Sequence, residues 1–158
     1  MTRSSRALQP WRVLLVVALA CTALLPLLPL LSTYVPASAV IERAFSAWFD
    51  LHCERDPART LSLLGVPLAV CARCSGIYFG LGAGAALRRP ALTPGALRLW
   101  VLAAAAWMLL DVTLEAHGLH GPWAAERVLS GVLLSYPVGV GLGAAALGAP
   151  ARLPAQSP

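Results

Sequence analysis

Three of the four cysteines lie close together in the chain, in the pattern Cys53-x17-Cys71-x2-Cys74. Thiolates are preferred ligands of zinc and other thiophilic metals, so this spacing fits a metal site. It also fits a redox pair, because Cys71 and Cys74 are three residues apart and can share one face of a helix. A thiolate near a helix N-terminus is stabilised by the helix dipole, and Arg73 between the two cysteines adds positive charge.

A tetrahedral zinc site with three cysteines needs a fourth ligand, and histidine is the usual one. His52 adjoins Cys53, and His117 and His120 lie in a turn that we expect on the same side of the membrane. Zinc suits this mixture of thiolate and imidazole best, with copper(I) or an iron–sulfur centre as alternatives. The third interpretation of the clustered cysteines is packing at the membrane interface, and Cys21, alone in an apolar run, is interpreted as packing.

The composition of the chain is that of a membrane protein. Of its 158 residues, 58% are hydrophobic and only 12% are charged, and the mean hydropathy is +0.72. Soluble domains are nearer a quarter charged. The net charge of +5 comes from arginine, because the chain has no lysine. These arginines are scattered around apolar segments, which favours membrane orientation over nucleic-acid binding.

We therefore expect an all-α fold, a single-domain integral membrane bundle of about four transmembrane helices, with a short amphipathic, extracytoplasmic segment after the first. The expected segments are a basic N-terminus (1–12), a first span or uncleaved signal anchor (13–35), an amphipathic segment and cysteine loop (36–66), a second span (67–87), a basic loop (88–98), a third span (99–116), a histidine-containing turn (117–123), a fourth span (124–147) and a disordered tail (148–158).

Prolines mark the ends and bends of these helices. Pro26 and Pro29 are expected to kink the first span, and Pro67 is expected to open the second as its first residue. Residues 37–39 (Ala-Ser-Ala) resemble a signal-peptidase site, so a cleaved signal peptide is the alternative for the first span. The apolar run is longer than a usual signal, which favours a retained helix.

Arginine counts orient the bundle. The strongest positive clusters are the three N-terminal arginines and the Arg88–Arg89 pair. Because positive charge is retained on the cytoplasmic side, both termini are expected in the cytoplasm. The cysteine loop and the histidine turn then face the extracytoplasmic side of a bacterial inner membrane.

Charges and small residues inside the predicted spans indicate how the helices pack. Asp111 and Arg127 would lie at similar depth on neighbouring helices, which predicts an intramembrane ion pair. Small residues recur every four positions and predict close helix contact, including a possible homo-oligomer through these faces. The two stripes are Gly76/Gly80/Gly84 and Gly131/Ser135/Gly139/Gly143.

Two blocks of the sequence resemble a known family. Residues 53–60 (CERDPART) and 70–80 (VCARCSGIYFG) are similar to a family of predicted prokaryotic membrane proteins called domain of unknown function 2085. The likeness covers roughly residues 45–145. The family has Cys-His-Gln where this chain has Cys-Glu-Arg, so His52, His117 or Glu54 would have to replace that histidine. The resemblance implies a membrane location, places Asp111, Arg127 and Gly131 in family positions, and supplies no activity.

Three functions remain open from the sequence. The leading one is a membrane protein with an extracytoplasmic, zinc-like cysteine site. The second is a thiol–disulfide oxidoreductase in which Cys71 and Cys74 form the active pair, Cys53 exchanges with them and quinone accepts the electrons. The third is a non-catalytic membrane scaffold or assembly subunit in the lipid bilayer. The sequence has no serine–histidine–acid set, phosphate loop or H-E-x-x-H motif, which favours a protein that is not an enzyme.

Overall fold

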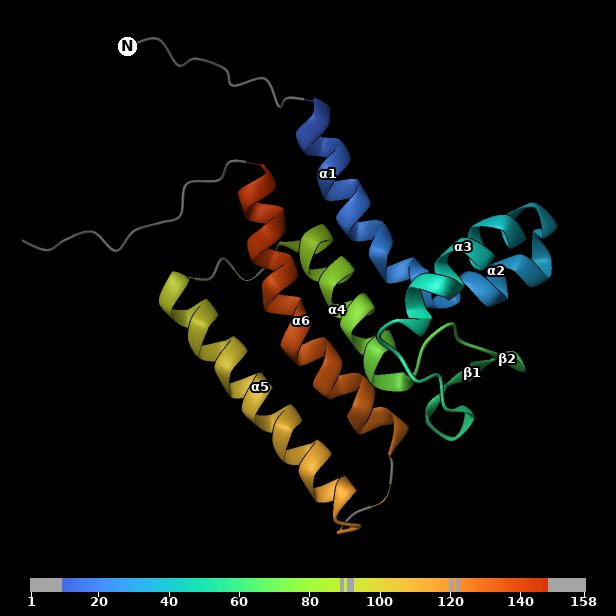
Figure 1. Cartoon of the computed structure of the whole chain (residues 1–158). Helices are drawn as coiled ribbons and strands as arrows, with labels where there is room; N and C mark the ends of the chain where they lie inside the picture. Colours follow the sequence, from blue (N-terminus) through green and yellow to red (C-terminus); the bar gives the residue numbers. More distant parts are fainter. Residues whose placement is uncertain (1–9, 89, 91–92, 120, 122, 148–158) are drawn as a thin grey trace, which may run out of the picture.

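The computed structural model describes residues 10–88, 90, 93–119, 121 and 123–147. Its elements, in chain order, are α1 (Pro10–Cys21), the 3-10 helix η1 (Thr22–Leu27), α2 (Leu28–Tyr34), η2 (Pro36–Ser38), α3 (Ala39–Asp50), η3 (Pro57–Arg59), the strands β1 (Ser62–Leu63) and β2 (Val66–Pro67), and the helices α4 (Ala72–Leu87), α5 (Pro94–Ala116) and α6 (Ala124–Ala146) (Figure 1).

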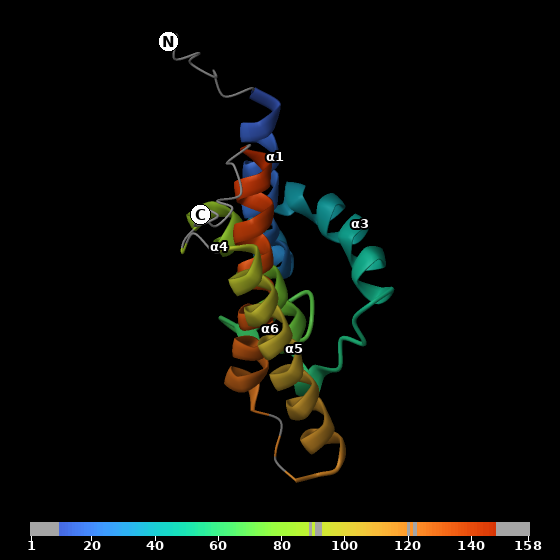
Figure 2. The same ribbon diagram turned by 90° about the vertical axis from the view of Figure 1, so that its left-hand side faces the viewer.

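The bundle consists of α1, α4, α6 and α5, which lie side by side in that order (Figure 1). The start of α1 and the end of α6 lie at one end of the bundle. The α5–α6 turn lies at the opposite end, whereas α4 begins short of that turn and α3 runs obliquely beside the middle of the bundle (Figures 1 and 2). The expected all-α membrane bundle is confirmed.

Three helices are long and apolar enough to cross a membrane: 10–34, 94–116 and 124–146. The expected second span at 67–87 is wrong in its length, because α4 has only 16 residues. At 1.5 Å per residue it is about 24 Å long, less than a hydrocarbon core of about 30 Å. The central helix of the bundle is therefore shorter than the helices around it.

Glycines hold α4 against α6. A side chain on Gly76 would overlap the backbone carbonyl of Val128, and one on Gly139 would overlap the carbonyl of Leu81. The two predicted small-residue stripes face each other within one chain, so the helices approach to backbone contact. Gly82, outside the predicted stripes, packs in the same way against η1 and the end of α1. Any homo-oligomer, which stays a prediction, would have to use another surface.

A proline in α6 creates the contact that positions α5. Pro137 has no backbone N–H, so the carbonyl of Leu133, four residues earlier, has no intrahelical donor. The indole Nε1 of Trp100 in α5 donates to this carbonyl at 3.0 Å. Trp100 also stacks at a tilt on Tyr136, with ring centroids 6.4 Å apart. One hydrogen bond thus serves the carbonyl that Pro137 leaves without its helical donor and fixes α5 on α6.

The first span is kinked, as the prolines predicted. The α-helix breaks into the 3-10 helix η1 at Thr22 and resumes as α2, so the chain turns away from the bundle axis (Figure 1). The carbonyl of Pro26 at this break accepts a hydrogen bond from the amide of Ala69, at 2.9 Å. The kink therefore anchors the cysteine loop to the first helix.

The third span begins earlier than expected. Pro94 opens α5, and the hydroxyl of Thr93 accepts a hydrogen bond from the amide of Ala96 at 3.2 Å. A threonine cap followed by proline is a strong signal for the start of a helix. The expected loop at 88–98 therefore contained the first residues of α5. The fourth span, expected at 124–147, is observed at 124–146.

Candidate metal centre

The structure brings Cys53, Cys71 and Cys74 into one group. Their three sulfur atoms all lie within 4.8 Å of one another, and all three thiols are free. Cys53 is buried and the other two are partly buried. Cys21 is also free but is exposed at the end of α1, so it is not packed within the chain as the sequence suggested. Three thiols from two distant parts of the chain form the candidate centre.

Each cysteine is positioned by a different local structure. Cys71 is the N-cap residue of α4, in an extended conformation, and Cys74 lies in the first turn of that helix. Cys53 follows α3, and its amide donates to the carbonyl of Phe49 at 2.9 Å. The amide of Cys71 donates to the sulfur of Cys53 at 3.2 Å. This bond joins the two halves of the site.

A small apolar core supports the cysteines. It is built from Phe49 of α3 and Val70 of the loop, which are 1% and 0% exposed, together with Leu28 of α2. Cys71, Cys74 and their neighbours pack on this core. The apolar residues of α3 therefore divide: Phe49 faces the core, whereas Val40, Ile41 and Trp48 stay exposed.

The loop before Cys71 contains a hairpin that the sequence analysis missed. Leu63 pairs with Val66, and the two turn residues Leu64 and Gly65 both have positive φ, at 52° and 78°. Such a two-residue turn matches the twist of antiparallel strands, and glycine suits its second position. Pro67 ends the second strand instead of opening α4, because its missing N–H is tolerated at a strand edge as well as at a helix start.

The environment of Cys71 favours its thiolate. Hydrogen bonds to its sulfur, first from the Cys74 thiol and then from nearby amides and Cys53, lower its pKa from 9.0 to about 5 against the opposing effect of burial. A thiol with such a pKa is ionised at neutral pH, and the thiolate is the form that binds metals and attacks disulfides.

The two described histidines, His52 and His117, lie outside the sulfur group. Among the residues that the structure describes, that group contains no histidine. The Nε2 of His52 is 3.2 Å from the hydroxyl of Tyr78, and the Nδ1 of His117 is 2.8 Å from the carbonyl of Thr113 in its own helix. His120 lies outside the described residues. A histidine as the fourth ligand stays a prediction.

Buried charges pair beside the cysteines. The predicted pair Asp111–Arg127 stays a prediction. Asp111 accepts a hydrogen bond from Arg73, and Arg127 binds both carboxylate oxygens of Glu115. Asp111 and Arg127 are 3% and 4% exposed. These pairs tie α4, α5 and α6 together at the end that carries the cysteines.

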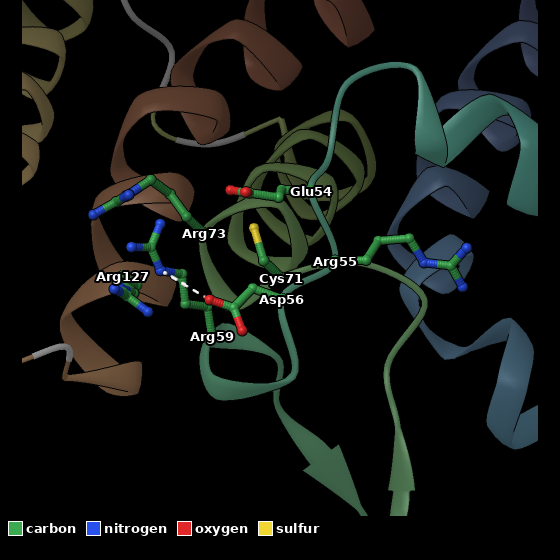
Figure 3. A pocket seen from close by; sticks show the side chains of 7 residues that line it. All are labelled: Glu54, Arg55, Asp56, Arg59, Cys71, Arg73 and Arg127. Carbon is green, nitrogen blue, oxygen red and sulfur yellow. Dashed lines mark ion pairs between the residues drawn. The ribbon is translucent and has the colours of Figure 1, made fainter.

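A pocket opens next to these pairs. It has a volume of about 80 Å³ and is lined by Glu54, Arg55, Asp56, Arg59, Cys71, Arg73 and Arg127 (Figure 3). Figure 3 shows the sulfur of Cys71 and the carboxylate of Glu54 at the same side of the pocket, with the guanidinium groups of Arg59 and Arg73 opposite. The thiol site is therefore open to a polar, arginine-rich cavity.

An α-helical membrane bundle with a cluster of three free thiols at one end is the class of protein that these features define. The chain belongs to a family described as predicted membrane protein (DUF2085), whose model matches residues 53–141. The match begins at Cys53 and includes the other two cysteines of the group. Neither the curated proteins nor the solved structures contain a match to the chain.

Proposed function

We propose that the cysteine group binds one thiophilic metal ion, with zinc as the best fit, and that the protein is a multi-pass membrane protein built around this centre. The observation that carries the proposal is the mutual distance of the three sulfurs, within 4.8 Å. Three sulfurs bonded to one zinc at about 2.3 Å would lie about 3.8 Å apart, so only a small contraction is needed.

The surroundings of the group support the proposal. Metal ligands must be deprotonated, and hydrogen bonds to the sulfur already lower the pKa of Cys71 to about 5. The backbone amide of Cys71 donates a hydrogen bond to the sulfur of Cys53. Metal ligands commonly accept or donate such hydrogen bonds with groups that do not themselves bind the metal. A fourth position would face the pocket that contains Glu54 (Figure 3).

Metal content of single variants tests this function. The full-length protein is purified in detergent without chelator, and metal is measured by elemental analysis. We expect about one metal per chain in the native protein, a loss in Cys71→Ser and in Cys74→Ser, and no loss in the control Cys21→Ser. Equal metal content in all three variants, or none in the native protein, would end the proposal.

The second candidate function is thiol–disulfide exchange, favoured by the lowered pKa of Cys71 and its position at the start of α4. In this function the thiols of Cys71 and Cys74 are oxidised to a disulfide, and the two electrons and two protons released reduce a quinone to a quinol. A metal-free protein that forms the Cys71–Cys74 disulfide when a quinone is added would favour this function. Thiols that neither bind metal nor oxidise would leave a scaffold.

The location of the site is part of the proposal. The three long apolar helices and the family support a membrane protein. The described chain starts and ends at the same end of the bundle, which fits the expectation that both termini lie in the cytoplasm (Figure 1). The cysteines at the opposite end would then face the extracytoplasmic side of a bacterial inner membrane.

A further inference from the structure

The pocket beside Cys71 has the size of a site for a small ion. Its volume of about 80 Å³ is several times the space that one water molecule needs, and it is well below the roughly 300 Å³ at which pockets for drug-sized ligands begin. A nucleotide or a peptide would not fit inside it. A small ion with one central atom and a few oxygens would fit.

The arginines that line this pocket differ in how their guanidinium groups are bound. Arg127 and Arg73 bind the carboxylates of Glu115 and Asp111. The Nε of Arg73 has no hydrogen-bond partner, but it is enclosed by protein atoms, so Arg73 contributes positive charge to the pocket wall and not this donor. The Nε of Arg59 lies 3.4 Å from a carboxylate oxygen of Asp56, and its Nη2 lies 3.8 Å from a carboxylate oxygen of Glu115. These two ion pairs involve Nε and Nη2 of Arg59, and among the residues that the structure describes no hydrogen bond is formed by Nη1, which is left to donate to a ligand.

We propose that this pocket binds a small oxyanion of the phosphate or sulfate type between Arg59 and Arg73. Guanidinium groups recognise such oxygens through paired N–H donors. The carboxylate of Glu54 points into the same space (Figure 3) and opposes the anion, which limits its affinity. The site lies next to the thiol group but does not rest on the proposed metal, and it goes beyond that function.

The chain offers a matched control for this proposal. Arg55 also lines the pocket, but its guanidinium points away (Figure 3). It donates to Ser46 at 2.7 Å and to Asp50 at 2.8 Å. Arg59→Gln and Arg55→Gln therefore remove the same charge from neighbouring positions, and only the first removes donors that face the pocket. Both side chains are partly exposed, so neither change should unfold the protein.

Calorimetric titration of the full-length protein in detergent, at constant ionic strength, measures the binding. Sodium phosphate and sodium sulfate are titrated against sodium chloride as the reference. We expect saturable binding of phosphate and sulfate, a Kd raised about tenfold in Arg59→Gln, and an unchanged Kd in Arg55→Gln. Glu54→Gln should lower the Kd, because it removes the opposing charge. The metal content of Arg59→Gln should equal that of the native protein.

The same titration in phosphatidylglycerol nanodiscs shows whether the ligand is a lipid headgroup or a free anion. A raised Kd for phosphate there supports occupation by a lipid headgroup, and an equal Kd supports a free anion. The proposal is overturned if phosphate and sulfate bind no better than chloride. It is also overturned if Arg59→Gln and Arg55→Gln change the Kd equally, because the effect would then be general surface charge.

Discussion

Among the single residues of the site, Cys71 has the most connections. Its amide donates to Cys53, its sulfur accepts hydrogen bonds from Cys74 and from nearby amides, and its side chain lines the arginine pocket. It is also the N-cap of α4, where the exposed amides of the first turn favour negative charge. The cluster therefore favours ionisation of one specific thiol.

The first prediction concerns the pH dependence of this thiol. In the metal-free protein, the rate at which iodoacetamide alkylates Cys71 should be half-maximal near pH 5, because only the thiolate reacts and its pKa is lowered to about 5. The rate should reach its plateau about one pH unit above this midpoint and stay nearly constant from there to pH 8. Mass spectrometry of the peptide that contains Cys71 measures this rate. In Cys74→Ala the midpoint should move to higher pH, because the main donor to the sulfur is lost. A native midpoint near pH 9 would contradict the account.

Much of this site could be predicted from residue types and spacing. The pattern of Cys53, Cys71 and Cys74 was sufficient to place the three thiols together, because two lie within one helical turn. The partners of the buried charges were not predictable in the same way. Arg73 enters from α4 and binds Asp111, and a comparison of depth along α5 and α6 alone cannot reveal a partner from a third helix.

At the scale of elements, α4 is the structural centre of the bundle. It lies between α1 and α6, is shorter than α6, and begins at the cysteine site. Its small residues let α6 approach to backbone contact, so a change of one methyl group at this contact affects the whole interface. Helices held in this way depend on shape more than on hydrophobic burial, because lipid is as apolar as the side chains.

The second prediction tests this contact with two glycines. Gly139→Ala should lower the free energy of unfolding by about 1–3 kcal/mol, because the new methyl group would overlap the carbonyl of Leu81. Gly95→Ala is the control, since a side chain there meets nothing within 4 Å. It should be neutral or slightly stabilising, because alanine is the better helix former. Reversible unfolding in mixed detergent micelles measures both, and equal effects would refute the close contact.

The third prediction tests the hydrogen bond from Trp100 to Leu133 with a double-mutant cycle. Trp100→Phe should cost about 0.5–1.5 kcal/mol of unfolding free energy, the usual range for such a bond between membrane helices. In the background of Pro137→Ala the cost should be smaller, because the new backbone N–H can serve the Leu133 carbonyl. Additive effects of the two changes would show that the bond does not depend on the proline.

The sequence predicts the bounds of a helix well where its apolar run is long. It predicts the bounds poorly where a loop adjoins the helix. The limits of α6 were predicted within one residue, because its small-residue and apolar pattern is continuous. Pro67 and Pro94 were misassigned in opposite directions, since proline fits a strand edge, a loop and a helix start. The hairpin around Gly65 involves only two-residue strands, which are too short to leave an alternating pattern.

The whole molecule separates a lipid-facing bundle from a polar end. The long helices expose apolar side chains around most of the bundle, whereas the thiols, the ion pairs and the arginine pocket gather where α4 begins. Every candidate for chemistry in the described part of the chain therefore lies near the start of α4. A group of charges and thiols at an interface avoids the cost of burying ions in hydrocarbon.

The fourth prediction concerns the side of the membrane on which the three clustered cysteines lie. In metal-free vesicles with the native orientation, a membrane-impermeant maleimide added outside should label Cys53, Cys71 or Cys74, because the arginine distribution orients the termini inward. Inverted vesicles should not be labelled at these positions until they are opened with detergent. The opposite pattern would reverse the proposed topology while leaving the structure of the site intact.

X-ray absorption spectroscopy at the edge of the bound metal tests the central claim most directly, because it counts the sulfur ligands. For protein purified with its metal, we expect three sulfur neighbours at about 2.3 Å and one lighter nitrogen or oxygen neighbour. The sulfur contribution should fall by one neighbour in Cys53→Ser if metal is retained. A metal surrounded only by nitrogen and oxygen would contradict the account, because it would lie somewhere other than the three cysteines.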